Sequence, residues 1–256
     1  MTDPVSVASA VSLRGLHKRF DKKVAVESVD LEVPIGTFYG LVGPNGAGKS
    51  TTLKMTTGLL RPDAGVAIVD GIDVWTDPRE LKTRIGVVGE DLRLFERLTG
   101  REMLHYVALL RGFDRDEADH RGQQLLNFLG LEEASGRLVI DYSAGMRKKI
   151  ALGAAVLHQP RVLFLDEPFE SVDPLSVRLI RDLLEQLVAG GATVVFSSHV
   201  MEVVERLCDH VAVMHQGHVV TQGVTAELCD GRRLEDVFVD KVGAIESSAE
   251  LDWLTR

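Results

Sequence analysis

The segment that most constrains this chain is rich in glycine and ends in a lysine, a serine and a threonine. It reads Gly43-Pro44-Asn45-Gly46-Ala47-Gly48-Lys49-Ser50-Thr51 and matches the pattern G-x-x-x-x-G-K-[ST]. Glycines let successive backbone N–H groups turn toward one anion, and the start of a helix adds the positive end of its dipole. An apolar segment, Phe38 to Val42, precedes the pattern, and a helix-like stretch from Lys49 to Gly58 follows it. The sequence therefore predicts a phosphate-binding loop between a strand and a helix.

The residues of this loop are predicted to bind a nucleotide together. Lys49 would reach the β- and γ-phosphates, and the Ser50 hydroxyl is an oxygen ligand suited to Mg²⁺. The alternative is a chance glycine-rich turn, which would not require a strand before it and a helix after it.

A second feature is an apolar strand, Val162 to Leu165, that ends in the carboxylates Asp166 and Glu167. In a parallel sheet, the carboxyl end of such a strand faces the site where a nucleotide binds. Asp166 is predicted to hold Mg²⁺, through water, and Glu167 to polarise the water that attacks the γ-phosphate. Two acids could also be a solvated strand end, but the phosphate loop favours the catalytic interpretation.

The rest of the chain alternates between apolar strand-like runs and helix-like stretches. Thr99, with Glu102 three residues on, predicts the start of one helix, and Asp114 begins another. This pattern predicts an α/β fold with a parallel sheet covered on both faces. Further strands are expected at 11–16, 24–33, 37–42, 66–69, 85–88, 193–196 and 211–214, with a helical insert at about 90–160.

Composition limits the partners and the cellular location expected for this chain. Lys and Arg number 29 and Asp and Glu number 38, so the formal net charge is -9 and no nucleic-acid partner is expected. Cys208 and Cys229 are expected to be reduced thiols. The apolar stretch Ile150 to Leu157 falls short of the roughly 18–20 residues that span a bilayer. Asp3 and Arg14 argue against a secretory signal, so a membrane role would need a separate partner.

Between the two nucleotide motifs lies Asp141-Tyr142-Ser143-Ala144-Gly145-Met146-Arg147-Lys148-Lys149. This segment resembles the signature motif of ATP-binding cassette (ABC) proteins, usually written Leu-Ser-Gly-Gly-Gln, in a form similar to that of export-type cassettes. Ser143 is also predicted to cap a helix that runs to His158, so that free N–H groups face an anion. The resemblance implies that Ser143 and Gly145 contact the γ-phosphate held by a second cassette in a head-to-tail dimer. An ordinary capped helix is the alternative.

Other positions resemble further landmarks of the same family. Phe20 stands where an aromatic residue stacks on adenine, although many relatives have Tyr there. The segment Phe169 to Pro174 resembles the loop that crosses the dimer interface, and His199 matches a histidine that contacts the γ-phosphate. One position departs from the family: Glu90 replaces the usual Gln. Glu90 is predicted to face Mg²⁺ and assist catalysis, but its added negative charge leaves its effect on turnover and coupling open.

The resemblance spans roughly residues 11 to 225 and implies a P-loop NTPase core of RecA-like type. A mostly parallel sheet, an N-terminal antiparallel β subdomain and the helical insert are expected within a nucleotide-binding domain at 1–225. Residues 226–256 are expected to form a helical tail, and Leu234 to Val239 resembles the tail of exporter cassettes.

The function implied by the resemblance is ATP hydrolysis, with ATP and Mg²⁺ bound, to drive export through an integral membrane permease. The chain would be cytoplasmic and peripheral on the inner face of the cell membrane, paired with its own copy or a paralogue. The sequence does not identify the cargo, and it favours export over import only by resemblance. A cassette ATPase that acts on the ribosome or nucleic acid, and a regulatory ATP-binding module without turnover, are the alternatives.

Overall fold

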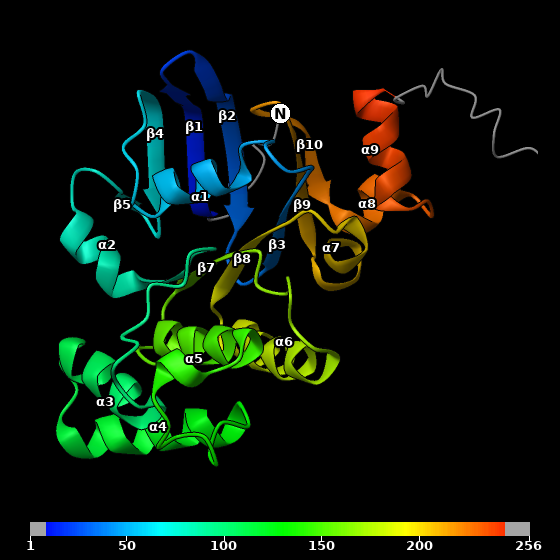
Figure 1. Cartoon of the computed structure of the whole chain (residues 1–256). Coiled ribbons are helices and arrows are strands. Elements are labelled where there is room, and N and C mark those ends of the chain that lie inside the picture. The colour runs from blue at the N-terminus through cyan, green and yellow to red at the C-terminus, as the bar shows by residue number, and fades with distance from the viewer. Residues whose placement is uncertain (1–8, 244–256) are drawn as a thin grey trace, which may run out of the picture.

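The strands of this chain join into one hydrogen-bonded sheet in the order β5-β4-β1-β2-β10-β9-β3-β8-β7-β6. The computed structural model describes residues 9–243. Figure 1 shows helices α3 to α6 grouped on one side of the strands, with α5 and α6 next to β7 and β8 and with α3 and α4 farther out. Within residues 9–243, none of the helices combines the length and the apolar character that crossing a bilayer requires.

The strands are β1 (Ser9–Phe20), β2 (Lys23–Pro34), β3 (Phe38–Val42), β4 (Ala64–Val69), β5 (Ile72–Asp73), β6 (Ile85–Val88), β7 (Val162–Asp166), β8 (Thr193–Ser198), β9 (His210–His215) and β10 (His218–Val224). The α-helices are α1 (Lys49–Thr56), α2 (Pro78–Arg84), α3 (Gly100–Leu110), α4 (Arg115–Phe128), α5 (Ala144–Val156), α6 (Pro174–Ala189), α7 (Met201–Leu207), α8 (Thr225–Cys229) and α9 (Leu234–Val242). Helix α8 begins one residue before the predicted tail at 226–256 and α9 lies within it, while residues 244–256 lie outside the described part of the chain.

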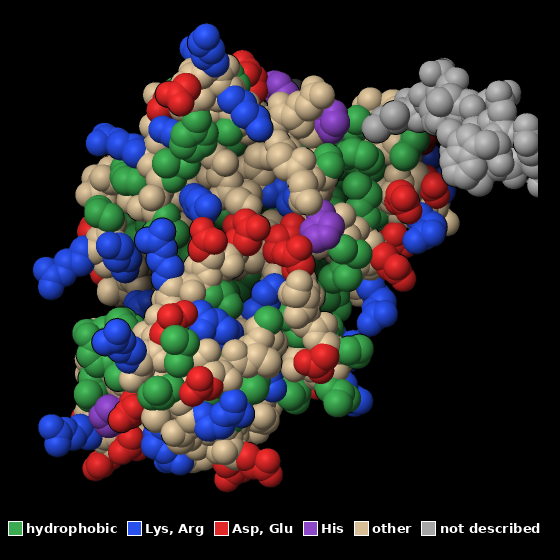
Figure 2. All heavy atoms as spheres, viewed as in Figure 1, with side chains coloured by type: hydrophobic (Ala, Val, Ile, Leu, Met, Phe, Trp, Pro, Cys, Tyr) green, Lys and Arg blue, Asp and Glu red, His purple; other side chains and the backbone are tan. Residues whose placement is uncertain are grey.

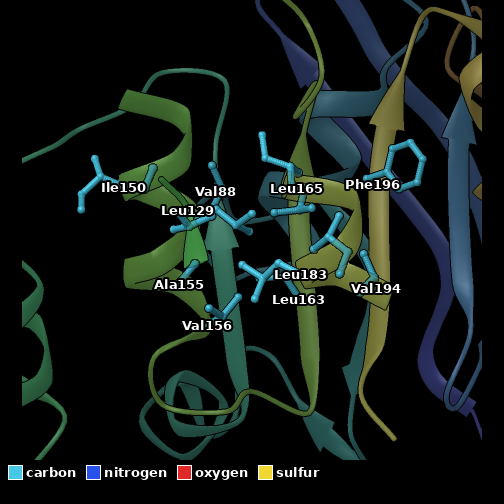
Figure 3. Close-up of a cluster of buried hydrophobic side chains, with 14 of the residues drawn as sticks. Val88, Leu129, Ile150, Ala155, Val156, Leu163, Leu165, Leu183, Val194 and Phe196 are labelled. Atoms are coloured by element: carbon cyan, nitrogen blue, oxygen red, sulfur yellow. The ribbon is translucent and has the colours of Figure 1, made fainter. Parts of the chain in front are cut away.

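Strands β9, β3, β8, β7 and β6 pair in parallel and form the core of the sheet. Along β8, Val194 and Phe196 face one core cluster and Val195 faces the other, as side-chain alternation requires. Figure 3 shows the first cluster, in which strand side chains such as Leu163 meet Ala155 of α5 and Leu183 of α6. The second cluster contains residues of α1, β1, β2 and β4. Both faces of the parallel sheet are therefore covered, and this prediction is confirmed.

The predicted antiparallel β region near the N-terminus is also confirmed. β1 pairs antiparallel with β2 and β4, and β4 pairs antiparallel with β5. The pairing of β1 shifts register around Gly15, whose φ is 57°. Beyond this bulge, β1 still pairs with β2, so the strand extends to Phe20 and not to the predicted end at Leu16. β10 joins this region to the core sheet through one parallel pair, His218 with Ser28.

The helix starts predicted in the insert are found where side chains cap them. Thr99 and Glu102 form a reciprocal capping box at α3, and the Asp114 carboxylate accepts a hydrogen bond from the Glu117 N–H at α4. The segment before α3 is not helical. α5 ends at Val156, two residues earlier than predicted, because Gln159 takes a left-handed φ of 55° and a proline follows it.

The contact between α5 and β6 is so close that only glycine fits at Gly86. A Cβ there would lie 2.4 Å from the Ala155 carbonyl oxygen and 2.8 Å from the Leu163 side chain. The backbone of α5 cannot yield to such an atom without shifting the whole helix against the sheet. Gly86 thus sets how near the helical insert lies to the parallel sheet.

We expect Gly86→Ala to lower the free energy of unfolding by about 1–3 kcal/mol, because overpacking forces the backbone apart. Gly136→Ala is the matched control, since its Cβ would have no neighbour within 4 Å. The control should stay within about 0.5 kcal/mol of the parent protein in urea titrations. Equal stability of the two variants would contradict the assigned role of Gly86.

Candidate functional site

The backbone of residues 43–48 forms a loop that leads directly into α1, which begins at Lys49. Gly46 and Gly48 have φ of 82° and 106°, and a Cβ at Gly48 would lie 2.6 Å from the Ala25 carbonyl oxygen. Glycine is therefore needed at Gly48 both for its conformation and for its contact with β2. Because Gly48 has no side chain to cap α1, the first N–H groups of that helix remain available to an anion.

Lys49 places a positive charge inside this loop. Its side chain is 5% exposed, and Nζ donates to the carbonyl oxygens of Gly43 at 2.7 Å and Pro44 at 3.2 Å. Nζ also lies 3.6 Å from Oε1 of Glu167. A buried cation held at the mouth of a glycine-rich loop suits a phosphate group.

Asp166, at the end of β7, contacts Ser50 in the first turn of α1, although β8 lies between β7 and β3, the strand that precedes the loop. Ser50 Oγ donates to Asp166 Oδ1 at 3.0 Å, and Ser197 Oγ donates to the same oxygen at 2.5 Å. A hydroxyl and a carboxylate side by side form the hard oxygen set from which Mg²⁺ takes its few protein ligands beside water and phosphate. Ser50 and Asp166 therefore fit a magnesium ion.

Glu167 is held by contacts on both its backbone and its carboxylate. It is 8% exposed and has a left-handed φ of 49°. Its N–H donates to Ser197 Oγ at 3.0 Å, and its Oε2 lies 3.1 Å from Nδ1 of His199. The His199 backbone N–H approaches the same oxygen at 3.4 Å. The carboxylate is thus fixed between Lys49 and His199, a geometry that suits a general base.

Five of the predicted site residues therefore lie in one contact network: Lys49, Ser50, Asp166, Glu167 and His199. Figure 2 shows acidic side chains in a row across the middle of the molecule with a histidine at one end, near the labels of β7 and β8 in Figure 1. Basic side chains lie next to this row in the same view. This mixture of charges surrounds the place where a charged nucleotide would bind.

Other predicted residues lie apart from this network. Glu90 is exposed, and within residues 9–243 no hydrogen bond or ion pair joins it to Ser50 or Asp166. Its role at Mg²⁺ therefore stays a prediction. Ser143 is exposed and caps α5 by accepting from the Met146 N–H at 3.3 Å. Gly145 is partly buried on the same turn.

Phe20 ends β1, next to the turn that leads into β2, and is 47% exposed. Lys18 Nζ lies 5.6 Å from the centroid of its ring. The close approach of Gly48 to Ala25 puts this hairpin beside the phosphate loop. The ring is exposed, and its stacking on adenine stays a prediction.

Two residues that position the network were missed by the sequence prediction. Ser197 bridges Asp166 and the backbone of Glu167, and Lys148 donates to the Glu167 carbonyl oxygen at 2.8 Å. The signal for Ser197 was present, because hydroxyl residues end an otherwise apolar strand in the nucleotide-binding sheet. The contact of Lys148 had no comparable signal, since a lysine on a helix is usually solvated.

A family model described as "ABC transporter" matches residues 26–170. The daunorubicin/doxorubicin resistance ATP-binding protein DrrA of Streptomyces peucetius is 40% identical over 219 residues, which cover 86% of this chain and 66% of that protein. The ABC transporter ATP-binding protein NatA of Bacillus subtilis (strain 168) is 38% identical over 240 residues, which cover 91% and 98%. A solved ATP-binding subunit of an ABC transporter has a TM-score of 0.84 at 28% identity, covering 91% of this chain and 99% of that chain.

We expect Lys49→Ala to weaken ATP binding by roughly 10- to 100-fold, because a charge-assisted hydrogen bond to phosphate is lost. Lys54→Ala is the matched control, since Lys54 is an exposed lysine of the same helix. Isothermal titration calorimetry would measure both dissociation constants, and thermal unfolding would verify that both variants fold. Unchanged affinity in Lys49→Ala would contradict the phosphate-loop assignment.

Proposed function

The chain belongs to the ABC transporter family as an ATP-binding subunit, and on this basis we propose that it hydrolyses ATP to drive export through a separate membrane permease. The observation that carries the proposal is the position of Glu167. Its carboxylate lies between Lys49, in the phosphate loop, and His199, at the end of the next strand. This arrangement suits hydrolysis better than binding alone.

In the proposed reaction, the chain's own residues bind the nucleotide, orient a water and hold its proton. Lys49 and the N–H groups at the start of α1 bind the β- and γ-phosphates, and Phe20 stacks on the adenine. Glu167 accepts a hydrogen bond from the attacking water, and His199 holds the carboxylate and reaches the γ-phosphate. Mg²⁺, held by Ser50 and Asp166, supplies charge neutralisation at the phosphate oxygens when it is bound.

A second cassette completes each site in this proposal. Ser143 is exposed at the start of α5, and α5 carries no acidic residue in its first turn. The start of a helix without acidic residues favours the binding of an anion. Within residues 9–243, Ser143 makes no hydrogen bond to the phosphate loop of its own chain. In a head-to-tail dimer, Ser143 and Gly145 would contact the γ-phosphate held by the partner cassette. The partner is a second copy of this chain or a paralogue.

The membrane partner is an integral permease, and the chain is a cytoplasmic subunit attached to the inner face of the membrane. The drug resistance named for DrrA supports export over import. Residues 1–225 would act as the nucleotide-binding domain, with the insert at about 90–160 and the Glu90 loop passing motion to the permease. The segment 226–256 would form a tail.

The partner is tested with Glu167→Gln protein loaded with ATP and used to capture complexes from detergent-solubilised native membranes. Mass spectrometry should find a polytopic membrane protein in stoichiometric amount. Lys49→Ala protein, which cannot hold ATP well, is the matched control for capture that depends on nucleotide. Recovery of ribosomal proteins or nucleic acid without a membrane protein would overturn the transport proposal.

We expect Glu167→Gln to keep ATP binding but to lower turnover by roughly 10²–10⁴-fold, because the amide cannot take a proton from water. Phosphate release measures turnover, and calorimetry measures binding in the same preparation. Asp182→Asn on α6, a half-buried carboxylate that pairs with Arg178 and Arg181, is the control for loss of one carboxylate, and it should hydrolyse ATP normally. Near-normal turnover of the Glu167 variant would remove this residue from the mechanism.

A further inference from the structure

Lys148 lies in the second turn of α5 and reaches out of the helical insert to the turn that follows β7. Its Nζ donates to the carbonyl oxygen of Glu167 at 2.8 Å and also to the carbonyl oxygen of Glu170. The Glu170 N–H approaches the Glu167 carbonyl oxygen at 3.3 Å. One ammonium group therefore closes the turn from 167 to 170 on its carbonyl side.

This contact meets Glu167 where its backbone is strained. A φ of 49° is unfavourable for a residue with a Cβ, and such a conformation persists only where the surroundings hold it. Ser197 holds the Glu167 N–H, and Lys49 and His199 hold its carboxylate, all from the sheet side of the molecule. Lys148, which belongs to the helical insert, adds a hydrogen bond to the Glu167 carbonyl oxygen.

The surroundings of Lys148 strengthen its hydrogen bonds to the two carbonyl oxygens. Burial lowers the pKa of this lysine, and the carboxylates of Glu170, Glu167 and Glu90 raise it in part. A partly desolvated ammonium beside carbonyl oxygens and three carboxylates makes stronger hydrogen bonds than one in water. A small cavity lined by Lys148, Gly89 and Asp166 places the amine between the Glu90 loop and the end of β7.

We propose that Lys148 is a positioning residue. It fixes the backbone turn from 167 to 170 and thereby sets the direction of the catalytic Glu167 carboxylate. The proposal rests on the proposed hydrolytic role of Glu167. Lys148 itself does not touch the nucleotide in this assignment. Its effect is therefore on the rate of hydrolysis and not on the affinity for ATP.

The test compares Lys148→Met with Lys148→Arg, which keeps a cationic donor, and with Lys54→Met, a control at an exposed lysine of α1. Steady-state phosphate release gives kcat and KM, calorimetry gives the ATP affinity, and thermal unfolding reports on folding. If Lys148→Met does not fold, Lys148→Gln, which keeps a donor but has a shorter reach, takes its place.

We expect Lys148→Met to lower kcat by roughly 10- to 100-fold, because a small misplacement of a catalytic group is costly. The affinity for ATP should change by less than about threefold, since ground-state binding is untouched. Lys148→Arg should recover most of the rate. Lys148→Met added to Glu167→Gln should change the residual rate by less than about twofold, because the lysine acts through the residue already replaced.

Three results would overturn the assignment. The first is a normal kcat in Lys148→Met while Glu167→Gln is slow, which leaves the proposed function intact. The second is an equal loss of rate when Lys148→Met is added to Glu167→Gln, which would show an independent effect. The third is full turnover in Glu167→Gln itself, in which case the role of Glu167 and that of Lys148 both fail.

Discussion

The site depends on the register of three neighbouring parallel strands. Val42 of β3 lies opposite Ser198 of β8, and Ser197 of β8 lies opposite Asp166 of β7. These pairings bring the loop after β3 and the polar ends of β8 and β7 to the same edge of the sheet. A slip of one residue would turn Asp166 or Ser197 to the other face and separate the oxygens. Since side chains of β7 and β8 are buried on both faces, the apolar core holds the register on which the chemistry relies.

Much of this arrangement was predictable because its signals are local. The phosphate loop, the strand before Asp166 and the caps at Thr99 and Ser143 each depend on a few adjacent residues, and the structure has these elements where they were expected. Strand β10 was not predicted, because its side chains are mostly half-exposed and it lacks a clear apolar alternation. It becomes a strand because it pairs with β9, and no pattern in the local sequence predicts this pairing.

Contacts between distant segments were the part that sequence could not supply. Ser197 contacts both Asp166 and Glu167 only because β7 and β8, which helix α6 separates in the sequence, are adjacent and in register. The left-handed backbone of Glu167 is likewise imposed by its neighbours. Glu90 is exposed in the structure, and its carboxylate acts on the pKa of Lys148, while its predicted role at Mg²⁺ stays a prediction. The position of a residue in a loop can predict that it lies near a site, but it does not predict which atoms its side chain contacts.

The hydrogen bonds of Lys49 have a consequence for ligand selectivity. Its ammonium is already bound to the carbonyl oxygens of Gly43 and Pro44 and lies near the Glu167 carboxylate. A ligand must compete with these internal partners, so only the difference in free energy contributes to affinity. A doubly charged phosphate group can win this competition, whereas a nucleoside without phosphates offers the lysine nothing in return. We therefore expect the loop to discriminate against uncharged analogues, because these offer Lys49 no partner in exchange for the internal ones.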